Sequence, residues 1–174
     1  MKRVLVSALI LSFSILLLSA GVNAAEASKI GYVDLQKVLN LSRAGKAAKD
    51  QLSEKVKKYQ EEINKKQEDL KKLKDVIEKQ GAYLSEKAKS DKEKDYQQSL
   101  KEFQRLTKDA QEELQAKDEE LTRHILGDIE KVVQDYGRKN DYTIIFVRNE
   151  SMLYASDKSD LTDEILKIFD SSNK

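Results

Sequence analysis

Apolar positions in the middle of the chain recur with the spacing of a coiled-coil helix. The steps between them alternate between four and three residues, which is the 3.5-residue repeat of a left-handed coiled coil. The first stripe consists of Leu52, Val56, Tyr59, Ile63, Lys66, Leu70, Leu73 and Ile77, and the second of Tyr96, Leu100, Phe103, Thr107, Ala110, Leu114, Lys117 and Leu121. Two matched stripes predict an antiparallel helical-hairpin arm, which we place at residues 43–139.

Local signals mark the two ends of this hairpin. The tip falls at about residues 81–90, where Gly81 can end the first helix in a left-handed conformation and either Ser85 or Ser90 can cap the second. Beyond residue 121 the apolar positions step by four twice in succession, which breaks the heptad. These positions are Ile125, Ile129, Val132 and Tyr136. The second helix is therefore expected to leave the coiled coil near its carboxyl end.

Short β-favouring runs bracket the hairpin. One run, at residues 30–33, precedes it, and two more, at 142–147 and 152–155, follow it. The last two flank a polar connection at 148–151 and predict a β-hairpin, after which an amphipathic helix covers the sheet. The predicted fold class is α+β and mostly α. It has a small three-strand β head, in two parts at 25–42 and 140–174, and one long arm.

The head is predicted to be incomplete in a single chain. Three short strands and one short helix cannot bury a run as apolar as residues 144–147 on both faces, so partner subunits are required. The residues expected in subunit contacts are Ile30, Tyr32, Val33, Ile144, Ile145, Phe146 and Leu153.

The amino-terminal segment has the pattern of a cleavable signal peptide over residues 1–24. Lys2 and Arg3 precede an apolar run, and small side chains before Ala24 suit a processing enzyme. An uncleaved anchor is the alternative, but the run has about 15 residues and a spanning helix needs roughly 20. Cleavage after Ala24 would leave 30 basic and 31 acidic residues, a net charge of −1, in an exported compartment.

Composition excludes most catalytic and metal chemistry. The 174 residues include 32 Lys and Arg, 31 Asp and Glu, one His and no Cys or Pro, for a net charge of +1. Thiol catalysis and zinc clusters are thereby excluded, and near neutrality argues against nucleic-acid binding. His124 is expected to pack at the seam or surface, and heptad flanks account for the many acids. We therefore expect no enzyme active site, metal or cofactor.

The chain resembles the Skp/OmpH family of periplasmic chaperones over essentially the whole mature sequence. The segments that carry the resemblance, together with the Lys/Glu/Gln-rich hairpin, are Lys29-Ile30-Gly31-Tyr32-Val33-Asp34, Asp141-Tyr142-Thr143-Ile144-Ile145, Leu153-Tyr154-Ala155 and Asp160-Leu161-Thr162-Asp163-Glu164. The resemblance implies a periplasmic homotrimer in which three heads form a small β-barrel. Three arms then surround a cavity that holds unfolded outer-membrane β-barrel proteins without ATP.

Client-binding candidates under this resemblance lie near the free end of the arm. The apolar candidates are Val76, Ala82, Tyr83 and Leu84, and the basic ones are Lys79, Lys87 and Lys89. Residues 65–94 carry ten lysines and seven acids, so the tip is basic and could attract acidic clients or anionic lipid headgroups. Two alternatives stay open: Tyr83 and Leu84 could close the tip on themselves, and the lysines could form only a solvated face.

One rival function shares the same fold. A structural coiled-coil spacer or adaptor of the cell envelope would have the same arm but would recognise a folded partner. Well-known members of the family are strongly basic overall, whereas this chain is nearly neutral. Strong electrostatic capture of clients is therefore not expected.

Overall fold

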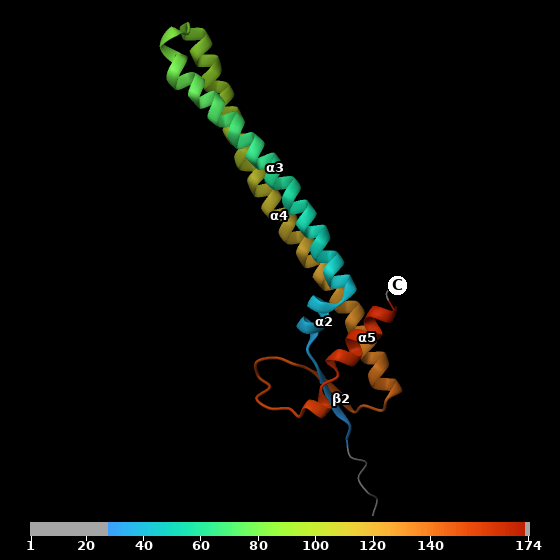
Figure 1. The fold of residues 1–174 in the computed structure, drawn as a ribbon. Coiled ribbons are helices and arrows are strands. Elements are labelled where there is room, and N and C mark those ends of the chain that lie inside the picture. Colours follow the sequence, from blue (N-terminus) through green and yellow to red (C-terminus); the bar gives the residue numbers. More distant parts are fainter. Residues whose placement is uncertain (1–27, 173–174) are drawn as a thin grey trace, which may run out of the picture.

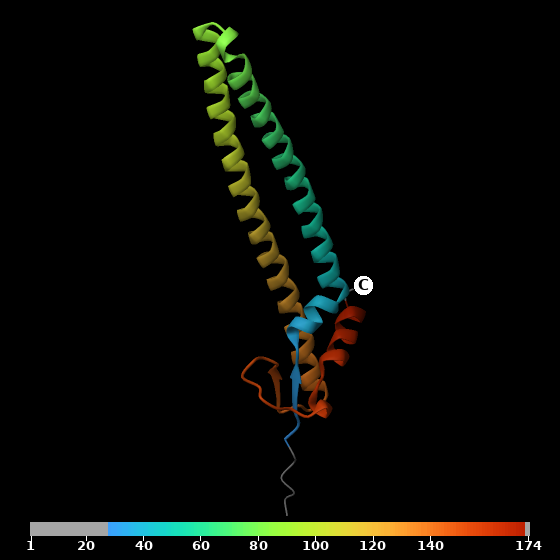
Figure 2. The same ribbon diagram turned by 60° about the vertical axis from the view of Figure 1, so that its left-hand side comes forward.

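The structure is a computed structural model that describes residues 28–172, and the predicted signal peptide lies outside them. The described chain forms a small head and one long arm (Figures 1 and 2). The elements in chain order are β1 (Ile30–Val33), α2 (Leu35–Leu41), α3 (Arg43–Gln80), the 3₁₀ turn η1 (Gly81–Tyr83), α4 (Glu86–Lys139), β2 (Ile144–Val147), the 3₁₀ turn η2 (Asp157–Ser159) and α5 (Thr162–Ser172).

Helices α3 and α4 form the arm and confirm the predicted antiparallel hairpin (Figure 2). At 1.5 Å per residue the 38 residues of α3 extend about 55 Å. Most members of both heptad stripes are less exposed than their neighbours, and Leu70 and Ala110 are buried. Val56 and Thr107 are the exceptions, because both remain exposed. The two helices thus meet along one narrow apolar seam.

The tip differs in one respect from the prediction. Gly81 has φ −56° and ψ −30°, so it is right-handed, and the prediction of a left-handed helix end is wrong. The chain tightens into η1 instead, which is a common way to end a helix without a left-handed residue. Of the two cap candidates, Ser85 begins α4 by accepting a hydrogen bond from the Ala88 backbone N–H at 3.2 Å.

The sheet joins the two ends of the chain. Strands β1 and β2 pair in parallel, with Ile30 opposite Ile144 and Val33 opposite Val147. The other edge of β1 is occupied by the chain after η2, since Asp160 bridges to Tyr32 and the Leu161 N–H bonds to the Tyr32 carbonyl at 2.9 Å. Within residues 28–172, the outer edge of β2 has no neighbouring strand.

The predicted strand at residues 152–155, and with it the β-hairpin, is not formed in the single chain. This segment is irregular, and the polar connection before it folds on itself. The Asn149 carbonyl accepts from the Met152 N–H at 3.0 Å, and the Asn149 side chain accepts from the Ser151 N–H at 3.0 Å. These local bonds satisfy the turn without directing the following residues back along β2.

The core lies where the arm enters the head. Side chains from β1, α2, the root of α4, α5 and the residue just before α5 are buried together: Val33, Val38, Ile125, Ile129, Leu161, Ile165 and Phe169. The predicted amphipathic helix α5 is present and packs against α2, α4 and β1. The positions after the heptad break are therefore those that anchor the arm to the head.

A sharp joint connects α2 to α3. Ser42 is fully buried, and its hydroxyl accepts from the Gly45 N–H at 3.1 Å, which begins α3. The Arg43 N–H donates to the Asp170 carboxylate of α5 at 2.9 Å, so the root of α3 is also tied to the far end of the chain. A Cβ on Gly45 would lie 1.7 Å from the Leu39 carbonyl oxygen. Only glycine therefore permits this approach.

Two glycine-to-alanine changes should have opposite effects on stability. Gly45→Ala should destabilise by on the order of 1–3 kcal/mol, because its methyl group collides with backbone. Gly81→Ala meets nothing within 4 Å and should be neutral or stabilising by up to about 1 kcal/mol. Chemical denaturation followed by circular dichroism measures both. Equal effects of the two changes would contradict the proposed role of Gly45 at the joint.

Candidate functional site

The free end of the arm carries the predicted tip residues. Tyr83 is 90% exposed in η1, whereas Leu84 and Val76 are half-buried. Ala82 also belongs to η1, and its side chain lies outside the described part of the structure. The exposure of Tyr83 leaves its ring free for contacts beyond the chain, and the partial burial of Leu84 fits closure of the tip.

The three predicted lysines surround this end of the arm in different settings. Lys79 lies in the last turn of α3 and pairs with Asp75 at 3.1 Å. Lys87 is exposed in the first turns of α4, and Lys89 is half-buried there. The structure thus brings all three into the same region as Tyr83, with one of them already engaged by a carboxylate.

Charged side chains cross the seam at two levels of the arm. Glu113 of α4 accepts hydrogen bonds from both Lys55 and Tyr59 of α3. The bond from Lys55, followed by that from Tyr59, holds the pKa of the Glu113 carboxyl below its usual value. Farther toward the tip Lys66 donates to Glu102 at 2.7 Å, and this bond lowers the pKa of Glu102 in the same way.

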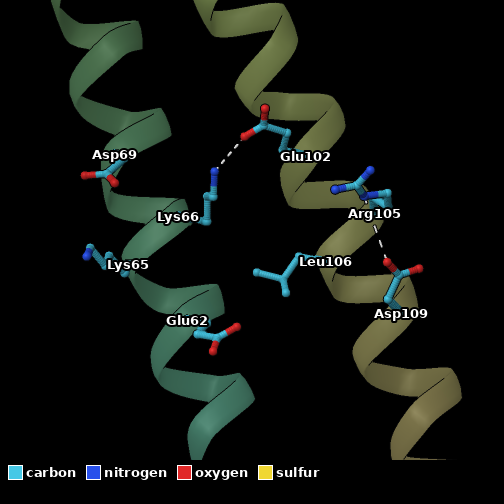
Figure 3. A pocket seen from close by; sticks show the side chains of 8 residues that line it. All are labelled: Glu62, Lys65, Lys66, Asp69, Glu102, Arg105, Leu106 and Asp109. Carbon is cyan, nitrogen blue, oxygen red and sulfur yellow. Dashed lines mark hydrogen bonds and ion pairs between the residues drawn. The ribbon is translucent and has the colours of Figure 1, made fainter.

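A groove of about 500 Å³ lies beside the Lys66–Glu102 pair (Figure 3). Its walls are almost entirely charged, and Leu106 is the one apolar side chain among the residues that line it. The charges largely engage one another, as Arg105 also lies 3.9 Å from Asp109. Such a groove arises because the two helices pack along a single seam. Its charged side chains face solvent, as on an ordinary protein surface.

The head exposes an unusual amount of apolar side chain. Among the predicted contact residues Ile30, Ile144 and Phe146 are each about half exposed, and Leu153 is 97% exposed. Tyr32 and Val33 lie instead inside the chain's own head, where they are buried. Ile145 is half-buried on the opposite face of β2 from its exposed neighbours.

Two exposed head residues were missed by the sequence reasoning. Val147 is 51% exposed and Tyr154 is 86% exposed, and both belong to the same apolar runs as the predicted contact residues. Their membership of those runs was the available signal. The sequence offered no sign of a further feature, a groove between α4 and β2 that is lined by both apolar and charged side chains, because its walls come from three separate elements.

The described residues hold no cluster of His, Cys, Asp and Glu suited to a metal ion. No helix among residues 28–172 combines the length and hydropathy needed to cross a bilayer. His124 is exposed on α4, with its Nδ1 3.2 Å from the Asp128 carboxylate.

Comparisons with known proteins agree on one family. A family model described as "Outer membrane protein (OmpH-like)" matches residues 29–169. The crystal structure of a candidate outer membrane chaperone (OmpH-like) from Caulobacter crescentus CB15 is similar, with a TM-score of 0.77 and 15% identity. The match covers 87% of this chain and 89% of that chain, and at this identity it shows a shared fold. No curated protein sequence gives a significant match.

The lowered pKa of Glu113 predicts a pH-dependent contribution to arm stability. A carboxyl with a lowered folded pKa stabilises fully above its ordinary pKa of 4.5, and this contribution is lost as pH falls through the folded value. Glu113→Gln should therefore lower the melting midpoint at pH 7, and its difference from the unchanged protein should shrink in strong acid. Glu61→Gln, at an exposed position on α3, is the control. A Glu113→Gln deficit that is constant with pH would contradict the prediction.

Proposed function

The chain belongs to the OmpH-like family of outer membrane proteins, and we propose that it is an ATP-independent holdase for unfolded outer-membrane β-barrel proteins. The same proposal places the mature protein in the periplasm after cleavage of residues 1–24. The chaperone role follows the family, whereas the kind of client and the holding mechanism are inferred from the arm. No catalytic group or cofactor takes part in the proposed mechanism.

The observation that carries the proposal is a long, charged arm attached to a small head (Figure 1). A rod with one narrow seam presents mostly solvated side chains, so its contacts with a client are individually weak and exchange readily. Weak contacts over a large surface can keep an unfolded chain from aggregating without trapping it. An isolated arm cannot enclose anything, so the mechanism requires several arms around a common space.

The proposal therefore includes a homotrimer built through the heads. It is supported by the unpaired outer edge of β2, whose exposed Ile144, Phe146 and Val147 would favour aggregation if left uncovered. Ile30, which pairs with Ile144, extends this apolar surface, and Leu153 is a further exposed apolar side chain of the head. The number three comes from the resemblance to the Skp/OmpH family.

The tip of the arm is the proposed region of client contact. Tyr83 offers an exposed aromatic ring, Ala82 and Leu84 flank it in sequence, and Val76 lies in the last turns of α3. Lys79, Lys87 and Lys89 would add attraction for acidic segments, and also for anionic lipid headgroups near a membrane. Because such attraction acts between exposed charges, it should weaken as salt is added.

The decisive experiment separates a holdase from an envelope spacer or adaptor. Purified mature protein is mixed with urea-unfolded β-barrel membrane proteins, the urea is diluted, and light scattering reports aggregation. A holdase should keep several unrelated barrels soluble, and these should compete for binding with similar affinities. Failure to keep any of them soluble would contradict the proposal. Selective binding of one folded partner would favour the adaptor.

Removing the exposed ring at the tip should weaken client binding without unfolding the arm. Tyr83→Ser should raise the dissociation constant for an unfolded barrel about two- to tenfold, the equivalent of an aromatic contact of about 0.5–1.5 kcal/mol. Gln104→Ser, at an exposed position along α4, is the matched control. Fluorescence anisotropy with a labelled client measures both. Equal affinities for the two variants would remove Tyr83 from the proposed contact region.

A further inference from the structure

The first residue of α3 is capped by a side chain from the far end of the chain. The Arg43 N–H donates to the Asp170 carboxylate of α5 at 2.9 Å, although 127 positions separate the two residues. The other cap of this helix end is local, because the Ser42 hydroxyl accepts from the Gly45 N–H. Figures 1 and 2 show the end of α5 beside the start of α3. Helix α5 thus supplies part of the cap of the arm.

Helix α2, in contrast, is bound to α5 and belongs to the head. Near the beginning of α2, the Asp34 N–H donates to the Thr162 hydroxyl at 3.0 Å, and Lys37 pairs with Asp163 at 2.7 Å. Val38 in the middle of α2 is fully buried in the core. Because α2 is held to α5 in this way, α3 can turn relative to the head only at the joint between α2 and α3. The bond from Asp170 spans that joint.

The helix that contains Asp170 does not account for a carboxylate at this position. Asp170 lies in the last turn of α5, where the negative end of the helix dipole disfavours an anion. Aspartate is also a weak helix former. At the start of α3 the dipole is positive and the first N–H groups have no partner within the helix, so an anion is favourable there. The contact with α3 therefore explains the presence of Asp170.

The seam between the arm helices is open just beyond the joint. A cavity of about 250 Å³ lies between α4 and the root of α3. It is lined by polar side chains and by Leu39, Ala48, Leu52, Leu121 and Ile125. Protein interiors are normally close-packed, so a cavity at this level leaves fewer contacts that fix the direction of α3. It also provides space into which the root of α3 can move.

We propose that Asp170 is a latch, a releasable contact that holds the arm in one direction relative to the head. While Asp170 caps α3, the root of the arm is fixed to α5. When this bond opens, α3 turns about Ser42 and α4 bends above its buried root at Ile129. The bond joins exposed groups and contributes little to the free energy of folding, so it can open while the head stays folded. The inference goes beyond the proposed function, because the latch lies within the chain and acts with no client bound.

Two aspartates of α5 provide a matched pair of variants. Asp170→Ala removes the contact at the joint, whereas Asp163→Ala removes the pair with Lys37 near the other end of α2. The chain has no cysteine, so Lys57→Cys on α3 and Lys167→Cys on α5, both at exposed positions, introduce two spin labels. Labelled mature protein is refolded with a large excess of unlabelled protein of the same variant. Electron paramagnetic resonance then measures distances within one chain.

Asp170→Ala should broaden the distribution of distances between the two labels. Hydrogen exchange in the first turn of α3 should become about three- to thirtyfold faster, the loss expected for a helix cap. The melting temperature should change little, because an acid leaves an unfavourable helix end. Asp163→Ala should lower the melting temperature and leave the distances unchanged. An unchanged distribution for Asp170→Ala would overturn the latch, and equal broadening by both variants would also overturn it by showing general loosening of the head.

The donor of the same bond can be removed independently. Arg43→Pro lacks the backbone N–H, and proline is favoured at the first position of a helix. Ser42 has φ −64° and ψ 155°, a conformation that a following proline permits. Arg43→Pro should therefore broaden the distances as Asp170→Ala does, whereas Arg43→Ala, which keeps the N–H, should not. The two changes combined should broaden them no further, because both remove one bond. Additive broadening would show two separate effects and overturn the latch.

Discussion

The parallel pairing of β1 with β2 is the constraint on which the rest of the structure depends. Parallel strands cannot be joined by a tight turn and need a crossover connection. Here the crossover comprises α2, α3 and α4, and Lys29 lies beside Asn140 although 111 positions separate them in sequence. Of these helices, α2 contributes Val38 to the buried core and the α4 root contributes Ile125 and Ile129. The remainder of the crossover has no sheet to cover and must extend into solvent as a double helix.

Interactions within the arm favour one alignment of the helices more than they add stability. The pairs Lys55–Glu113 and Lys66–Glu102 are each partly exposed, so they contribute little to the free energy of folding. Sliding one helix along the other would separate both pairs at once and leave charges beside the apolar seam. Polar positions inside a coiled coil commonly select a register in this way. The arm is thus well aligned although it has no thick core.

The parts of the fold that could be predicted from sequence are those set by local pattern. Heptad spacing indicated the hairpin, and Ser85 was one of two cap candidates because its side chain can bond three residues ahead. The failures involve choices between competing contacts. Residues 152–155 have the composition of a strand, but a strand also needs a partner, and the described chain provides none beside β2. Gly81 permits a left-handed turn without requiring one.

The residues of the candidate site also divide into those that local sequence predicts and those whose burial depends on distant contacts. Exposure of Tyr83 could be expected from its place in a short turn, whereas burial of Tyr32 and Val33 depends on α5 and on the segment near Asp160 returning to β1. The groove between α4 and β2 could not be predicted from the sequence, because α2, α4 and β2 all contribute to it.

The two helices of the arm are connected to the head in different ways, and this difference has a mechanical consequence. A sideways force on the tip passes along α4 without interruption into the head, whereas α3 meets the head through the bend at Ser42. Helix α4 therefore connects the tip rigidly to the head, whereas α3 is hinged at its root. Any swing of the arm should pivot at the bend at Ser42.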